Sequence, residues 1–178
     1  MRPDQIAARM TGRLTQTAPG RTEAFLPSPK IQNHAAFLAP LPGGHLLCAW
    51  FGGTLEGKSD ISIHAAILPA GSDQWGPARL LSHDAARSEQ NPVIFATPDG
   101  GLWLFHTAQP SGNQDECQIR MAPLHLDPAD PTMISSGEGR FLDLPRGSFI
   151  RAPLVVRDDG AWLFADLSLH SAAGPEME

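Results

Sequence analysis

The loop between Gly52 and Asp60 carries the ionisable side chains whose types and spacing best suit chemistry. It holds two carboxylates, Glu56 and Asp60, with Lys58 between them. A carboxyl group can transfer a proton during bond cleavage, and a neighbouring ammonium group can hold an anionic substrate. We interpret Glu56 and Asp60 as candidate catalytic acid–base groups and Lys58 as a candidate substrate contact. The alternative is that all three are solvated loop side chains.

Other polar side chains stand where predicted strands begin and in a second polar loop, from 107 to 116. Amide, imidazole and guanidinium groups at such places can bind the polar or anionic groups of a ligand. The candidate substrate-binding residues here are His34, Gln90, Asn91, Gln114, Asp115 and Arg151. The alternatives are a hydrogen-bonded structural histidine at 34 and amides that cap the turns into their strands.

A repeat positions these residues. A shift of 56 residues places Gly44 on Gly100 and Ile63 on Ile119 without a gap, and a third copy begins at Gly160. Units of about 50 residues, built from short strands separated by turns, are typical of β-propeller blades. The sequence therefore predicts an all-β protein made of four-stranded antiparallel blades, with the polar segments of successive blades converging on one face as a binding cleft.

The strand pattern gives each blade its bounds. Apolar or alternating runs predict strands in three groups: 31–39, 46–51, 61–68 and 78–81; then 91–98, 102–108, 118–124 and 140–144; then 149–156 and 161–167. The blades accordingly span about 31–82, 90–145 and 149–168 onward. Residues 1–27 are expected to form an N-terminal arm, with a short helical turn at 6–10, ahead of the partial propeller at 28–178.

The blade count bears on assembly. About 2.5 blades are predicted, whereas closed propellers use about 4–8. Open strand edges favour self-association. Either the sequence is a fragment of a longer propeller, or its blades close by assembling with other chains.

Composition excludes several classes of protein. The formal net charge of -6 argues against phosphate-neutralising nucleic-acid binding and against an anionic membrane surface. The sequence has neither a span of about 20 apolar residues nor a signal-like N-terminus, so we expect a cytoplasmic protein. Cys48 and Cys117 lie in apolar or alternating runs and are interpreted as buried thiols, with a disulfide as the alternative. No histidine shows metal-ligand spacing, and we expect neither metal nor cofactor.

Four stretches carry a family resemblance. GGHLLCAWFGGTLEGKSDISIH, SEQNPVIF, GLWLFHTAQPSGNQD and FIRAPLVVRDDGAWLF resemble the sialidase-like proteins of the BNR/Asp-box repeat family. AGSDQWGPARLLS resembles a degenerate form of the Asp-box turn motif, in which Asp73 and Trp75 are retained. The resemblance implies the N-terminal portion of a six-bladed propeller and exo-α-sialidase activity. Such enzymes use a Tyr nucleophile with a Glu partner, an Asp acid/base and an arginine cluster.

The sequence departs from that pattern in two ways. It contains no Tyr, and Lys30-Ile31-Gln32 stands where the family has Arg-Ile-Pro. Only Arg151 lies at a strand start where it could bind a carboxylate. The leading hypothesis is a truncated sialidase-like glycoside hydrolase acting on a glycan or sialoside-like sugar. The alternatives are a non-catalytic carbohydrate-binding propeller fragment and a relative of the propeller polysaccharide lyases.

Overall fold

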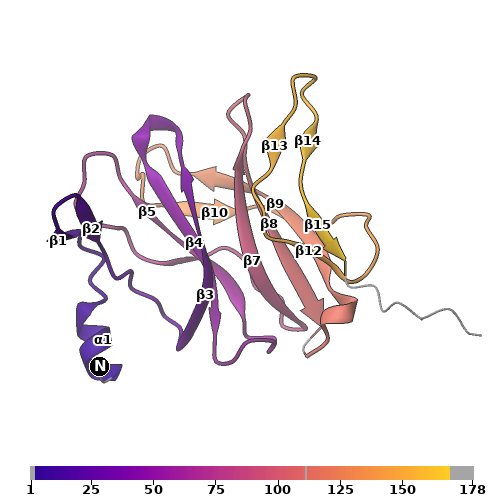
Figure 1. Ribbon diagram of the computed structural model, residues 1–178, viewed down its shortest axis with the longest axis horizontal. Helices are drawn as coiled ribbons and strands as arrows, with labels where there is room; N and C mark the ends of the chain where they lie inside the picture. The colour runs from indigo at the N-terminus through magenta and orange to yellow at the C-terminus, as the bar shows by residue number, and fades with distance from the viewer. Residues whose placement is uncertain (1–2, 111, 169–178) are drawn as a thin grey trace, which may run out of the picture.

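Three antiparallel blades and an N-terminal arm make up the computed structural model, which describes residues 3–110 and 112–168 (Figure 1). Blade 1 is a four-stranded sheet in the order β3-β4-β5-β6. Its strands are β3 (Gln32–Pro40), β4 (Leu46–Gly53), β5 (Ser62–Leu68) and β6 (Arg79–Leu80). The 3-10 turn η1 (Pro42–Gly44) joins β3 to β4, with Gly43 at a φ of 78° that favours glycine. The four strands predicted for this blade are confirmed.

Blade 2 repeats that arrangement. Its strands are β7 (Arg87–Ala96), β8 (Leu102–Pro110) and β9 (Gln118–Leu126), and η2 (Gln114–Glu116) lies between the last two. Its outer edge differs from the prediction, because two short strands, β10 (Ile134–Ser136) and β11 (Arg140–Phe141), both pair with β9. The 56-residue shift is confirmed by the strand starts, since β4 and β8 begin at Leu46 and Leu102.

Blade 3 consists of two broken strands in the part of the chain that the structure describes. β12 (Ser148–Ile150) pairs with β15 (Asp166–Ser168), and β13 (Val155–Val156) pairs with β14 (Trp162–Leu163). These are the inner two strands that the sequence predicts there. Residues 169–178, into which the predicted third blade continues, lie outside the described residues.

The arm packs against blade 1, on the side away from blade 2 (Figure 1). It contains the helix α1 (Pro3–Arg9) and a hairpin of β1 (Thr15–Ala18) and β2 (Arg21–Glu23). The Gly12 N–H donates to the Phe25 carbonyl at 2.9 Å, and the Gly12 carbonyl accepts from the Trp75 N–H at 2.9 Å. In the turn between β5 and β6, Asp73 accepts from the Arg13 guanidinium at 3.1 Å. The arm is thus tied to the outer turn of blade 1.

Successive side chains along each strand point to opposite faces of its blade, so the apolar core is made of separate clusters on the two faces. One cluster lies between blades 1 and 2 and includes Leu47, Ile63, Ile94 and Leu104. A second joins Phe95, Phe105 and Ile119 of blade 2 to Leu154 and Phe164 of blade 3. A third joins Cys48, Trp50 and Trp75 of blade 1 to Leu14 and Leu26 of the arm. Blade 2 is therefore covered on both faces.

The two cysteines are buried and free, as the sequence predicts. Burial raises the pKa of the Cys48 thiol and of the Cys117 thiol to about 11. No helix within the described ranges is long and apolar enough to cross a membrane.

Candidate functional site

A cleft of about 400 Å³ lies where the inner corners of the three blades meet. Its walls come from β3 and β4, from the β4–β5 loop, from β7 and η2, and from β12 and the residue after it. The cleft is lined by His34, Ala35, Phe51, Glu56, Gln90, Asn91, Gln114, Phe149 and Arg151. Six of the nine residues singled out from the sequence are in this set. The structure therefore brings together polar side chains that lie up to 117 positions apart in the sequence.

A bulge in each inner strand turns the backbone toward the cleft. The pairing register breaks between His34 and Phe37 in β3 and between Gln90 and Val93 in β7. Ala35 and Asn91, equivalent in the repeat, have φ values of 50° and 52°. Left-handed backbone is uncommon for residues other than glycine and costs about 1–2 kcal/mol, so such positions concentrate where a fold shapes a site. Here both bulges line the same cleft.

The amides of blade 2 are held by their own blade. The Gln90 side chain donates to the Ser88 hydroxyl at 3.0 Å, and Gln90 is only 3% exposed. The Asn91 side chain donates to the Thr107 hydroxyl at 3.3 Å, and that hydroxyl donates to the Gln90 carbonyl at 2.9 Å. These bonds fix the orientation of both amides at the cleft wall before any ligand arrives.

Glu56 is the carboxylate among the lining residues, and its loop is anchored at two places. The Glu56 N–H donates to the Gln32 side chain at 3.2 Å. The Gly112 N–H, in the loop that carries Gln114, donates to the Gly57 carbonyl at 2.9 Å. The polar loops of blades 1 and 2 are therefore joined, and Glu56 and Gln114 lie on a shared wall.

The remaining lining side chains supply rings and one cation. The exposed His34 ring stacks on Phe51, with ring centroids 5.4 Å apart and planes 14° from parallel. Phe149 from blade 3 adds a second phenyl ring, and Arg151 brings an exposed guanidinium. Apolar rings beside a few fixed polar groups and one charge of each sign suit a small polar ligand with a hydrophobic face.

Three predicted residues lie outside this lining. Asp60 accepts from the Thr54 N–H at 2.9 Å and from the Thr54 hydroxyl at 3.0 Å, so both of its oxygens bind within its own loop. Lys58 is exposed on that loop. Asp115 is exposed in the first turn of η2, where its N–H donates to the Asn113 side chain at 3.1 Å. In this arrangement Asp60 positions the loop that carries Glu56.

Sequence reasoning missed a buried charged cluster between blades 1 and 2. Arg120 donates to Glu89 at 3.1 Å and to Asp84 at 2.9 Å, and its guanidinium lies 4.4 Å from the centroid of the Phe141 ring. Burial raises the pKa of Glu89. Burial also lowers the pKa of the adjacent His106 to about 4. An ionisable group within an otherwise buried strand was the available signal, since Glu89 precedes Gln90 and therefore faces the other side of β7.

Within residues 3–110 and 112–168, no group of three or more His, Cys, Asp or Glu side chains is placed to hold a metal ion. The chemistry available at the cleft is that of Glu56, Arg151, the amides and the rings.

Comparison with known proteins gives the fold a context. The sequence model of the BNR repeat-like domain matches residues 44–176. No curated protein sequence matches the chain significantly. Among solved structures, a Hadza microbial sialidase, Hz136, superposes with a TM-score of 0.60 at 13% identity, covering 77% of this chain and 32% of that one.

Two further structures are similar over comparable stretches. The α-L-arabinofuranosidase from Lactobacillus brevis has a TM-score of 0.52 at 17% identity, covering 79% of this chain and 46% of that one. A thermostable family-43 glycoside hydrolase has a TM-score of 0.52 at 14% identity, with coverages of 83% and 53%. The present chain thus spans between a third and about half of each of these proteins, and the likeness confirms the propeller fold.

Proposed function

The chain belongs to the BNR repeat-like domain family, and from that premise we propose that its cleft binds the terminal sugar of a glycan and takes part in glycoside hydrolysis of the exo-α-sialidase type. The observation that carries the proposal is that Glu56 of blade 1, three amides of blade 2 and Arg151 of blade 3 converge on one cleft of about 400 Å³. That volume lies in the range of small-ligand pockets. All three structural neighbours are named as glycoside-cleaving enzymes or belong to a glycoside hydrolase family.

Each lining group has a role in this proposal. The Arg151 guanidinium pairs with the carboxylate of a sialic-acid-like sugar, because its planar donors match carboxylate geometry. Asn91 and Gln114 hydrogen-bond to ring substituents, with the buried Gln90 behind them, and the Phe149 ring together with the His34 ring, which stacks on the buried Phe51, covers the apolar face of the sugar. Glu56 donates a proton to the glycosidic oxygen as the bond to the anomeric carbon breaks, and the sugar-free alcohol leaves. A water molecule then bonds to the anomeric carbon and gives a proton to the Glu56 carboxylate, which restores the acid. Asp60 keeps the loop in place.

A fluorogenic sialoside tests the proposal. We expect the purified chain to release the fluorophore, Glu56→Gln to lose at least 100-fold of that rate, and Asp115→Asn to retain it, because general acid catalysis contributes about 100-fold or more. Asp60→Asn tests the sequence-based assignment of Asp60 as a catalytic group. If Asp60 only positions the loop, Asp60→Asn should lose part of the rate of fluorophore release. If that variant loses as much of the rate as Glu56→Gln does, Asp60 is the acid.

Binding without turnover is the second candidate, and the absence of Tyr from the sequence favours it, because sialidases form their covalent intermediate on a tyrosine. Calorimetric titration with sialyllactose and with lactose separates the two candidates. Saturable sialyllactose binding that Arg151→Met abolishes, without fluorophore release, would select the binding role. Neither binding nor release would reject both.

A further inference from the structure

Three side chains stand directly behind the cleft wall in blade 2. They are Glu89 of β7, His106 of β8 and Arg120 of β9, and we call them the blade 2 triplet. Glu89 precedes Gln90 in its strand, so its side chain points away from the cleft and toward blade 1. His106 and Arg120 are cross-strand partners. Glu89 and His106 are 0% and 1% exposed, so both are closed off from solvent.

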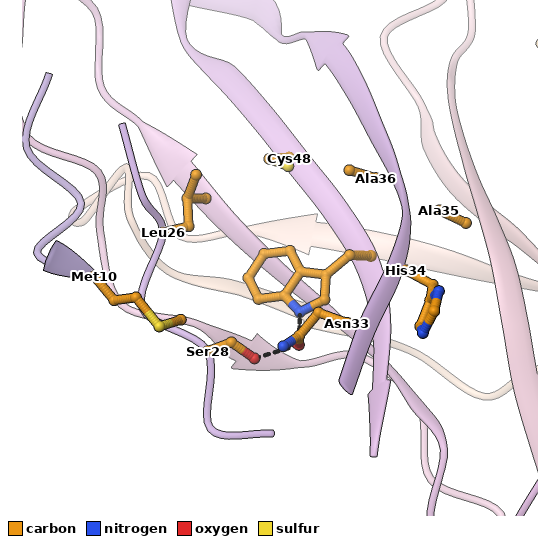
Figure 2. A pocket seen from close by; sticks show the side chains of 9 residues that line it. Met10, Leu26, Ser28, Asn33, His34, Ala35, Ala36 and Cys48 are labelled. Atoms are coloured by element: carbon orange, nitrogen blue, oxygen red, sulfur yellow. Dashed lines mark hydrogen bonds between the residues drawn. The ribbon is translucent and has the colours of Figure 1, made fainter. Parts of the chain in front are cut away.

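The internal repeat places a second triplet behind the cleft, in blade 1. The 56-residue shift carries the blade 2 triplet, member by member, onto Asn33, Trp50 and His64. The Trp50 indole donates to the Asn33 side chain at 3.0 Å and stacks on the His64 ring, with centroids 6.0 Å apart. Figure 2 draws this hydrogen bond together with the one from the Ser28 hydroxyl to the same Asn33 oxygen. Three equivalent positions therefore form a bonded triplet in both blades.

The two triplets differ in charge. Burial lowers the pKa of His64 to about 4, so the blade 1 triplet is neutral near pH 7. In blade 2 an arginine stands at the third position, and the Arg120 guanidinium donates to Glu89 at 3.1 Å. His106 Nε2 lies 3.8 Å from the same carboxylate, but burial lowers the His106 pKa to about 4 as well. The charge of Arg120 is therefore balanced by the carboxylates of Glu89 and Asp84.

The blade 2 triplet reaches the loop of blade 1 through the backbone. The Glu89 N–H donates to the Ile61 carbonyl at 3.1 Å, and the Ile61 N–H donates to the Lys58 carbonyl at 3.1 Å. Ile61 follows Asp60, whose carboxylate closes the loop that carries Glu56. Glu89 therefore holds the end of the loop on which the candidate acid lies.

The same triplet lies next to the amides of the cleft. Glu89 directly precedes Gln90 and the bulge residue Asn91 in β7. On β8, His106 Nδ1 is 3.2 Å from the Thr107 carbonyl. The Thr107 hydroxyl in turn donates to the Gln90 carbonyl at 2.9 Å and accepts from the Asn91 side chain at 3.3 Å. A displacement of the triplet is thus transmitted to both amides.

We propose that Glu89 is a positioning residue of the cleft, whose carboxylate, held by Arg120, keeps the loop of Glu56 and the amides of β7 in place. The effect on a ligand rests on the proposed function, whereas the positioning itself is a property of the free protein. The carboxylate is needed because its partner is a largely buried guanidinium, which a neutral amide would leave uncompensated. In blade 1 the third position holds a neutral histidine, and an asparagine suffices.

Amide hydrogen exchange, measured by NMR without ligand, tests the positioning. We expect Glu89→Gln to speed exchange at the Thr54 and Glu56 amides at least about tenfold, because the loop opens more often once its end is less firmly held. A purely structural role would instead change the core amides of β4 and β8, which open only with the whole fold, and leave the loop amides as they are.

Asp73→Asn is the matched control. Its ion pair with Arg13 has the same length as that of Glu89 with Arg120, 3.1 Å, but is exposed and far from the loop, so both loop amides should keep their exchange rates. If Glu89→Gln does not fold, Arg120→Lys replaces it. An ammonium group keeps the charge but lacks the fork that binds two carboxylates, so the loop amides should again exchange faster.

Calorimetric titration with sialyllactose tests the consequence for the cleft. Glu89→Gln should weaken binding at least about tenfold and Asp73→Asn by less than about twofold. In the fluorogenic assay, kcat should fall and KM rise together in Glu89→Gln, because the acid and the amides are both displaced.

The outcomes separate this inference from the proposed function. A wild-type chain that neither binds sialyllactose nor cleaves the sialoside would reject the proposed function, and the exchange rates alone would then decide the positioning. Unchanged exchange at the Thr54 and Glu56 amides, or equal acceleration in Asp73→Asn, would overturn the positioning role. Faster exchange with unchanged sialyllactose affinity would overturn its link to the cleft.

Discussion

Arg120 and Glu89 form an ion pair at 3.1 Å in the interface between blades 1 and 2, and the Glu89 side chain is fully buried. The same guanidinium binds Asp84 at 2.9 Å. One cation therefore joins a carboxylate on the inner strand of blade 2 to one on the connection between the two blades. Because Glu89 directly precedes Gln90 and Asn91, this pair anchors the strand that presents both amides to the cleft.

Arg120→Leu is expected to lower the free energy of unfolding by about 3 kcal/mol, because removing one partner of a buried pair leaves the other charge uncompensated. Urea unfolding measures the loss. Arg146→Leu is the matched control, since its pair with Glu116 is largely exposed and should contribute less than about 1 kcal/mol. Equal losses of unfolding free energy in the two variants would show that the buried ion pair stabilises the fold no more than the exposed pair does.

The two buried histidines, His64 and His106, should each lower stability as the pH falls from about 6.5 to about 4, whereas Glu89, whose pKa burial raises, acts in the opposite direction. Burial lowers the pKa of His64 and of His106 from 6.5 to about 4, so the unfolded chain takes up two protons in this interval that the folded chain does not. The stabilisation is fully present above pH 6.5. Each histidine accounts for a loss on the order of 2–3 kcal/mol by the time the pH reaches its folded pKa.

His64→Phe isolates one of these contributions. The His64 ring stacks on Trp50 at 6.0 Å, and its Nε2 atom has no hydrogen-bond partner among the described residues, so a phenyl ring suits the site. Urea titrations between pH 4 and 7 should show the pH slope reduced by up to one proton, with stability at pH 7 kept or raised. The exposed His125→Phe should leave the slope unchanged. An unaltered slope in His64→Phe would contradict the assignment.

Sequence alone predicted the blades well because their inner strands are uniformly apolar and their spacing repeats. It predicted six of the cleft residues because polar side chains gather at the starts of the inner strands and in the loops that follow β4 and β8. It could not tell that Asp60 binds Thr54, since a loop carboxylate near glycines suits either a site or a turn. Glu89 was left unassigned, although the alternation of side chains along β7 places it on the face opposite Gln90.

The arm was the least predictable part, and one glycine tests how it docks. Gly12 has a φ of +74°, and a Cβ atom there would lie 2.9 Å from the Gln74 side-chain nitrogen and 3.3 Å from Trp75. Gly20 has nearly the same φ, +73°, with nothing within 4 Å of its Cβ position. Gly12→Ala and Gly20→Ala therefore share the backbone cost, about 1 kcal/mol, and differ in the steric contact.

Thermal unfolding should place Gly12→Ala below Gly20→Ala by the equivalent of about 1–2 kcal/mol, because an added methyl group forces packed neighbours apart. Limited proteolysis should cut the arm of Gly12→Ala faster. Equal behaviour of the two variants would mean that the arm tolerates displacement from blade 1.

The final prediction concerns Asp60 and distinguishes a role in holding its loop from a role as a catalytic acid. Its two oxygens bind the Thr54 N–H and hydroxyl, and the loop they close carries Glu56. Asp60→Ala should lower the free energy of unfolding by about 1–2 kcal/mol and speed hydrogen exchange at the Thr54 amide, because that amide loses a charged acceptor. Asp115→Ala, at an exposed site on the neighbouring loop, should change neither quantity. Unchanged exchange at Thr54 in Asp60→Ala would remove the positioning role and return Asp60 to the set of candidate acids.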